Sequence, residues 1–188
     1  YTPAHFFDLK GLRVGLPSSF YFEKCDPEIL AATKRVIERL EEGGASLREV
    51  QLPAMEEART VSLTVQMPEA LSYHSRYLEE KAELYEADFR AGLALGQCLL
   101  AEHYLRAKRF ITRYRQETDV VFKDVDVIIT PGAPVVAPRV GQAFIDWGGD
   151  QEPVGNAITR YTSFFNMTGH PAIALPSGTF CRCPSIQL

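Results

Sequence analysis

Ser18 and Ser19 directly follow Pro17 at the end of an alternating apolar run. The turn after a strand is a position where a nucleophilic serine can sit. In this sequence, however, no glycines surround the pair and no base is placed beside it. We therefore interpret the two serines as part of a polar turn.

Tyr73 and His74 follow Glu69 by four and five residues, about one helical turn, which places an imidazole near a carboxylate in sequence. A histidine near a carboxylate can act as a general base. A single such group in a helix-rich segment is more often a structural histidine with satisfied hydrogen bonds. The sequence leaves both interpretations open and favours the structural one.

The sequence gives little support for a metal-binding or phosphate-binding site. The four cysteines are scattered apart from Cys181-x-Cys183, and the four histidines form neither a zinc finger nor an HExxH pattern. Gly148-Gly149-Asp150 lacks the strand and helix that flank a phosphate loop. We expect reduced thiols, a turn at the glycines, and neither a metal ion nor a cofactor.

A substrate pocket is predicted where a strand ends, because ligands of parallel α/β sheets bind at the carboxyl ends of the strands. Aromatic and thioether side chains would suit an apolar ligand group there. The predicted wall comprises Thr130, Pro131, Phe165 and Met167, with Tyr73 and His74 at the rim. No residue of the chain is predicted to be catalytic.

The first fifty residues predict a βαβ unit. Leu12 to Pro17 alternates as a short strand, and Asp26-Pro27 caps and opens a helix that stops at Gly43-Gly44. A second extended run, from Leu47 to Leu52, ends at Pro53. The expected arrangement is therefore two parallel strands joined by a right-handed crossover helix.

The segment from Ala54 to Phe122 is rich in helix-forming residues and predicts three or four helices. Pro68 is expected to open one of them, because proline is tolerated in the first turn. The longest helix is expected from Leu99 to Phe122, with apolar residues at steps of three and four. We interpret its basic residues as a solvated face rather than as an anion-binding surface.

The last third alternates extended and irregular segments. Val125 to Ile129 is continuously apolar and predicts an interior strand. The stretch from Thr130 to Asp150 has closely spaced prolines and glycines and is expected to be loop. Ala172 to Leu175 predicts a short buried strand, and Phe164 is expected in the core.

Composition is that of an ordinary globular protein, with 46% hydrophobic and 23% charged residues in 188, and the chain is expected to form a single unit, 1–188. The net charge of −4 gives no reason to expect nucleic acid. No apolar run approaches the ~20 residues that span a bilayer. We expect a cytoplasmic protein that binds neither nucleic acid nor membrane.

Six segments of the chain resemble the C-terminal half of amidase-signature enzymes, in the expected order and at about the expected spacing. They are LKGLRVGLP (9–17), DPEILAATKRVIERLEEGGA (26–45), EALSYH (69–74), YLRAKRFITRYR (104–115), VDVIITPGAP (125–134) and FNMTGHPAIALPSG (165–178). No single segment is as specific as a catalytic signature. Six in register nevertheless make chance an unconvincing explanation.

The resemblance implies an α/β protein: part of an α/β/α fold with a mixed, mainly parallel sheet and a helical layer. It also implies carboxamide hydrolysis by a serine nucleophile, a bridging serine in a cis peptide and a lysine base. Those residues belong to the family's N-terminal half, and no GGSSGG-like run occurs here. The resemblance therefore implies no catalytic residue in this chain.

Two positions depart from the family pattern. The family's glutamine-dependent transamidation subunits carry an aspartate seven positions before the asparagine equivalent to Asn166, whereas this chain has Thr159. This favours a general amidase over an amidotransferase subunit. Residues 179–188 do not match the strand with which the family usually continues, which indicates a divergent, truncated or frame-changed tail.

The leading hypothesis is a fragment of a serine-dependent amidase that supplies scaffold and part of the pocket for a small-molecule amide, and that is inactive alone. The alternative is a non-catalytic binding or interaction domain that retains the scaffold. Half of a larger sheet would expose a strand edge and an apolar face, so self-association is expected.

Overall fold

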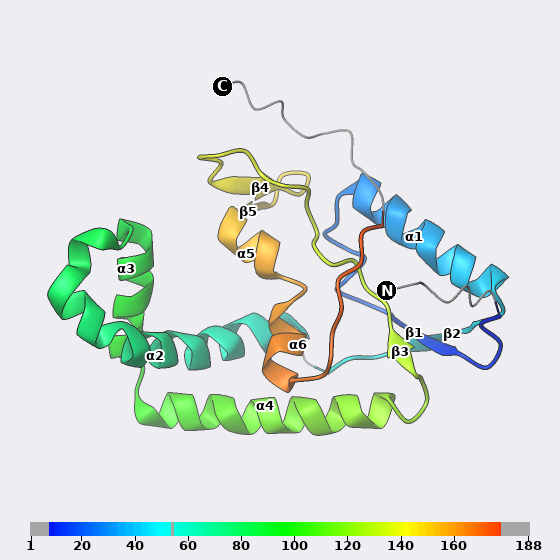
Figure 1. The fold of residues 1–188 in the computed structure, drawn as a ribbon, viewed down its shortest axis with the longest axis horizontal. Coiled ribbons are helices and arrows are strands. Elements are labelled where there is room, and N and C mark those ends of the chain that lie inside the picture. The colour runs from blue at the N-terminus through cyan, green and yellow to red at the C-terminus, as the bar shows by residue number, and fades with distance from the viewer. Residues whose placement is uncertain (1–7, 54, 178–188) are drawn as a thin grey trace, which may run out of the picture.

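Strand β1 (Arg13–Pro17) is the middle strand of a three-stranded parallel sheet in the computed structural model, which describes residues 8–53 and 55–177. It pairs with β2 (Ser46–Val50) on one side and with β3 (Val127–Ile128) on the other. The predicted parallel βαβ unit is therefore confirmed. The sheet lies at one end of the molecule, and the helices α2 to α4 extend away from it (Figure 1).

Helix α1 (Pro27–Glu42) begins and ends where its capping residues predict. The Asp26 side chain accepts a hydrogen bond from the Glu28 backbone N–H at 2.8 Å, and Pro27 needs no such partner. Gly44 follows the helix with φ of 98°, a backbone conformation that glycine adopts without steric cost. The buried face of α1 consists of Ile29, Ala32 and Thr33.

Helix α2 (Met55–Lys81) corrects the prediction that Pro68 opens a helix, because Pro68 lies inside it. Proline removes one intrahelical hydrogen bond, to the carbonyl of Thr64. Tertiary contacts hold the helix on both sides of that position. Before Pro68, Val65 is buried in the core; after it, Gly96 lies so close to the helix that a Cβ there would come within 3.1 Å of the Leu71 Cβ.

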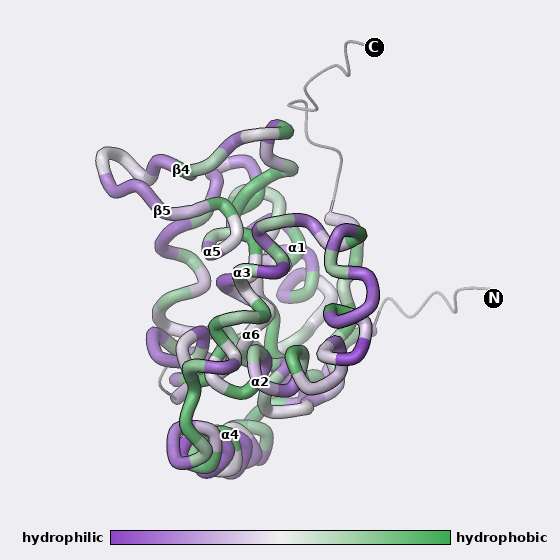
Figure 2. The backbone as a smooth tube through the Cα atoms, turned by 90° about the vertical axis from the view of Figure 1, so that its left-hand side faces the viewer, coloured by the Kyte–Doolittle hydropathy of each residue, from purple (hydrophilic) through white to green (hydrophobic). Residues whose placement is uncertain are grey.

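The remaining helices of this segment are η1 (Ala82–Leu84), α3 (Ala87–Leu95), η2 (Gly96–Cys98) and α4 (Ala101–Val121). Helix α4 matches the predicted 99–122 helix, but α2 is longer, with 27 residues against 21. Figure 2 shows hydrophilic and hydrophobic residues alternating around α4. Its inner face buries Ala107, Tyr114 and Thr118, and its basic residues are exposed, as predicted.

The core cluster lies where α2, α4 and α6 (Ser163–Thr168) meet the loop after β1. Phe164 and Tyr21 are fully buried there, and Tyr114 is 3% exposed. Their rings pack at tilted or edge-on angles, as aromatic side chains in protein cores commonly do. The expectation that Phe164 belongs to the core is confirmed.

Two strand predictions are wrong. Strand β3 is an edge of the three-stranded sheet in the described chain, not an interior strand, and Val127 is 39% exposed. Residues 172–175 form no strand, and Ile173 and Leu175 are 82% and 74% exposed. Among the described residues, β3 has a neighbouring strand on one side only, and residues 172–175 have none. An isolated strand cannot satisfy its backbone groups.

The stretch from Thr130 to Asp150 is not entirely loop, because β4 (Phe144–Asp146) pairs antiparallel with β5 (Gln151–Pro153). Gly148 and Gly149, at φ of 84° and 102°, form the turn between the strands. The turn expected at these glycines is confirmed, and α5 (Val154–Thr159) follows the hairpin directly.

No helix within residues 8–53 and 55–177 combines the length and the apolar character that a membrane crossing requires. In the same part of the chain, no group of three or more histidine, cysteine, aspartate or glutamate side chains is placed to hold a metal ion.

Candidate functional site

A cavity of about 560 Å³ lies between α2, α4, α5 and α6. This volume falls in the range of small-molecule sites in proteins. Its wall from α2 consists of Arg59, Ser62, Leu63, Val65, Gln66, Glu69 and Ala70. Lys108 and Ile111 come from α4, Gly155 and Thr159 from α5, and Thr162, Ser163, Asn166 and Met167 from the α6 region.

Helical periodicity explains why one face of α2 forms so much of this wall. Arg59, Ser62, Gln66 and Glu69 follow at steps of three and four residues, so their side chains lie on the same side of the helix. The helix rises ~1.5 Å per residue, which separates Arg59 from Glu69 by ~15 Å along its axis. Val65 is buried beneath them in the core.

Arg59 joins α2 to α5 at one end of the cavity. Its Nη1 donates to the Thr159 hydroxyl oxygen, and its Nη2 donates to Asn156 Oδ1 at 2.6 Å. Partial burial lowers the pKa of the Arg59 guanidinium, with Glu152 opposing the shift and Arg160 adding to it. An arginine nevertheless keeps its charge in proteins. The cavity therefore has a partly desolvated cation in its wall.

The neighbouring arginine, Arg160, has a carboxylate partner. Its Nη2 lies 2.6 Å from Glu152 Oε2, and both side chains are less than 20% exposed. Trp147 Nε1 donates to the same Glu152 oxygen at 2.8 Å. Hydrogen bonds from Arg160 and Trp147 stabilise the charged form and lower the pKa of Glu152, although burial opposes them. Glu152 thus holds Arg160 in a structural ion pair, although Arg160 Nε is buried without a hydrogen-bond partner among the described residues.

At the other end of the cavity, Glu69 accepts a hydrogen bond from the Tyr104 hydroxyl at 2.7 Å. This bond is the main reason why the pKa of Tyr104 is raised. Lys108 Nζ lies 6.0 Å from the centroid of the Tyr104 ring. A cation and an anion therefore occur together at this end, where their charges offset each other.

Met167 is the one predicted pocket residue that lines this cavity. Phe165 is half-buried and packs on the core cluster, with its ring 5.4 Å from that of Phe164. Thr130 is half-buried two residues after the end of β3, and Pro131 is buried. The proposed substrate-binding role of these four residues stays a prediction.

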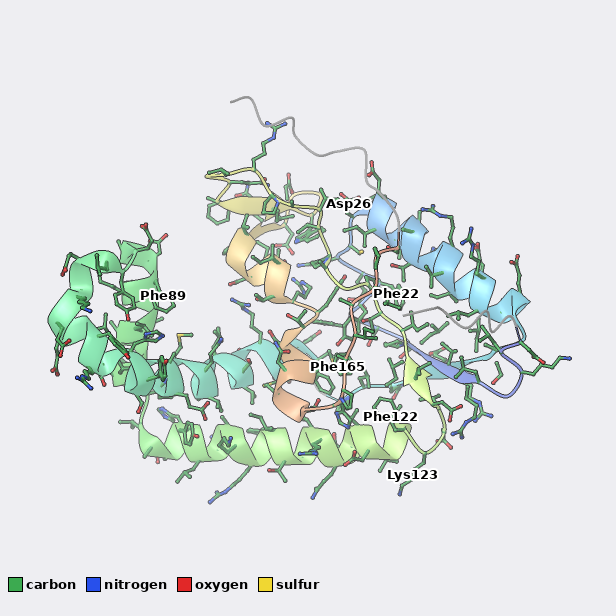
Figure 3. The ribbon with its side chains drawn as sticks, viewed as in Figure 1. Phe22, Asp26, Phe89, Phe122, Lys123 and Phe165 are labelled. Atoms are coloured by element: carbon green, nitrogen blue, oxygen red, sulfur yellow. The ribbon has the colours of Figure 1, made fainter. Side chains whose placement is uncertain are left out.

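Tyr73 and His74 belong to an aromatic cluster at the far end of α2. His74 Nδ1 lies 3.0 Å from the Tyr85 hydroxyl, and the His74 ring packs edge-on against Phe89 at 5.5 Å. Figure 3 shows Phe89 on α3, far from Phe165 at the centre of the molecule. The structure thus does not bring His74 and Phe165 together. The role of Tyr73 and His74 at a pocket rim also remains a prediction.

The other candidates from the sequence are turns or single thiols. Ser18 is exposed and its backbone N–H donates to the Val50 carbonyl at 3.0 Å, while the Ser19 carbonyl accepts from the Tyr21 N–H. Cys25 and Cys98 are free. Cys181 and Cys183 lie outside the described residues, as does the tail from residue 179.

Sequence reasoning missed Arg59 and Lys108, and used Thr159 only for a family comparison. The signal that could have found Arg59 was its spacing from Gln66 and Glu69. Predicting a helix start at Pro68 divided α2 and hid this shared face. Asn166 and Thr159 are far from α2 in sequence, so only the fold could place them opposite it.

Comparison with known proteins gives consistent matches. The family profile described as Amidase matches residues 3–182. An amidase from Pseudomonas putida is 40% identical over 171 residues, covering 90% of this chain and 37% of that protein. A glutamyl-tRNA(Gln) amidotransferase subunit from Chloroflexus aggregans is 29% identical over 202 residues, covering 95% of this chain and 40% of that protein.

Comparison with solved structures indicates the same family. A crystal structure of an amidase superimposes with a TM-score of 0.77 at 25% identity, covering 86% of this chain and 37% of that one. A protein from a vestigial complex related to an s-triazine catabolic enzyme gives the same TM-score at 26% identity, covering 86% and 35%. The chain thus spans well under half the length of these relatives. Its fold and its sequence together place it in the amidase-signature family.

Proposed function

We propose that this chain supplies the C-terminal part of a serine-dependent amidase that hydrolyses carboxamide C–N bonds. The observation that carries the proposal is the cavity between α2, α4, α5 and α6, which lies in a chain matched by the Amidase family almost throughout. Its half-buried Met167 and Ile111 suit the apolar part of an acyl group.

Under this proposal the chain alone is inactive. Amide hydrolysis needs a nucleophile, a base that activates it and donors aimed at the developing oxyanion. The resemblance assigns the serines and the lysine to the family's N-terminal half. What this chain contributes is therefore a wall of the substrate pocket and the scaffold that holds it.

A general amidase is a better match than an amidotransferase subunit. Thr159 occupies the position where the resemblance expects an aspartate in the transamidation subunits, and here its hydroxyl accepts a hydrogen bond from Arg59. The Pseudomonas putida amidase is also more similar to this chain than the Chloroflexus aggregans protein, at 40% against 29% identity.

The test is complementation. The chain is produced alone and together with the part of the Pseudomonas putida amidase that it does not match. Ammonia release from simple carboxamides should be at background for the chain alone and above it for the pair. A control pair with the partner's nucleophilic serine changed to alanine should return to background. Turnover by the chain alone, or an inactive but stably associated pair, would refute the proposal.

The competing function is a non-catalytic binding domain that retains the scaffold. The same cavity supports it, because binding a small molecule needs no nucleophile. An associated pair without hydrolysis, combined with ligand binding by the chain itself, would favour this alternative.

A further inference from the structure

Arg59 differs from its neighbour Arg160 in the kind of partner it has. Its two hydrogen-bond acceptors, Thr159 Oγ1 and Asn156 Oδ1, are both neutral. Among the described residues, no carboxylate forms an ion pair with it within 4.0 Å. A cation taken partly out of water is stabilised best by an anion, so its present surroundings compensate the charge incompletely.

The nearby carboxylate of Glu152 does not fully compensate the positive charge of Arg59. Glu152 acts on Arg59 electrostatically, but its Oε2 is bound to both Arg160 Nη2 and Trp147 Nε1. Two guanidinium groups therefore share one carboxylate. One positive charge is left over, and Arg59 is the arginine that faces the cavity.

The opposite end of the cavity does not carry such an excess. Glu69 and Lys108 both line it there, and the Tyr104 ring and hydroxyl link them. Their charges offset each other, and ~15 Å of helix separates Glu69 from Arg59. Repulsion between Glu69 and an anion bound at Arg59 is weak over that distance, because it exceeds the ~8 Å screening length at physiological salt.

The Arg59 guanidinium also has N–H groups that make no hydrogen bond within the described chain. Its two hydrogen bonds within the described chain use two of five N–H groups. A guanidinium pairs with a planar carboxylate through two parallel N–H···O bonds, which adds geometric selectivity to the charge. A neutral amide could not replace that interaction.

We infer that the Arg59 end of the cavity binds the carboxylate of the substrate, so that the substrate class is a small carboxamide that also bears a carboxylate. That the bound molecule is a substrate rests on the proposed function. The binding preference itself does not, because the chain carries the cavity and Arg59 without any partner.

The first experiment is an NMR titration of the 188-residue chain at constant ionic strength. The probes are glutaramate, the anionic monoamide of a five-carbon dicarboxylic acid, and the neutral diamide of the same acid. The Arg59 Nε–Hε signal and the Thr159 amide should respond to glutaramate at concentrations at least about tenfold below those of the diamide. Equal responses to both probes, or no response to either, would overturn the inference.

Matched variants locate the effect. Arg59→Gln should remove the preference for the anion, while Arg109→Gln, which removes the same charge from an exposed site on α4, should keep it. Arg59→Lys should retain part of it, because a lysine keeps the charge but loses the planar fork. An unchanged preference in Arg59→Gln, or an equal loss in Arg109→Gln, would refute the assignment. If Arg59→Gln does not fold, Arg59→Lys is the deciding variant. An affinity for glutaramate equal to that of the unmodified chain would then refute bidentate pairing between Arg59 and the carboxylate.

The result is separable from that of the complementation test. An active pair whose chain shows no preference for glutaramate overturns this inference and leaves the proposed amidase intact. A chain that binds glutaramate through Arg59, in a pair that hydrolyses no carboxamide, overturns the amidase proposal and leaves the carboxylate site standing.

Discussion

Two apolar stretches of this chain lie fewer than ten residues apart and end up in opposite surroundings. Helix α6 buries Phe164 completely in the core, against the rings of Tyr114 and Phe165, whereas Ile173 and Leu175, just beyond Gly169, are largely exposed. Both stretches read as interior segments in the sequence. The difference shows that an apolar pattern predicts burial but does not identify the part of the protein against which the segment packs.

The largest effect expected from this comparison is on stability. Phe164→Ala should reduce the free energy of unfolding by ~3–5 kcal/mol, because it leaves a cavity between α2, α4 and the loop after β1. Ile173→Ala should change it by less than ~0.5 kcal/mol, since that side chain is already in water. Urea unfolding of both variants checks this, and similar losses would show that residue 173 is buried after all.

The second effect concerns association. Ile173 and Leu175, together with the exposed β3 residue Val127, offer an apolar surface and an unpaired strand edge in the described chain. Such surfaces promote self-association. Sedimentation velocity should find oligomers of the unmodified chain and a larger monomer fraction for the double variant Ile173→Ser, Leu175→Ser. A compact monomer at high concentration for both proteins would contradict the prediction.

The smallest effect should come from the polar link at the start of β3. Arg13 donates to both carboxylate oxygens of Asp126, at 2.6 Å and 3.2 Å, and these hydrogen bonds lower the pKa of Asp126 to about 2. Because the folded pKa lies below the unfolded value of ~3.9, the contribution is present above pH ~4. It is lost as the pH falls towards 2.

Asp126→Asn should therefore be slightly less stable than the unmodified chain at neutral pH, and the difference should shrink between pH ~4 and ~2. Both groups are substantially exposed, so the effect is small compared with that of Phe164. Thermal unfolding followed by circular dichroism over this pH range measures it. A difference that grew on acidification would reverse the sign of the argument.

The candidate site, like the apolar stretches, could be predicted from the sequence only in part. Helix α4 was readable from local spacing, as its face that buries Ala107 and Tyr114 illustrates, whereas no helix was predicted for α5 or α6. The cavity was not readable, because it depends on Arg59 and Thr159 meeting across 100 residues. Pro68 is the clearest failure: its local chemistry predicts a helix start, and packing on both sides of it keeps α2 continuous.

The sequence by itself determined the βαβ unit, the caps of α1, the amphipathic helices and the family resemblance. These depend on neighbouring residues, whose capping, periodicity and turn preferences act locally. Only the tertiary structure decided that β3 is an edge strand in the described chain, that residues 172–175 are unpaired, and that Arg59 has neutral partners while Arg160 has Glu152. Strand pairing and charge compensation are contacts between distant residues, so no local pattern records which partner is present.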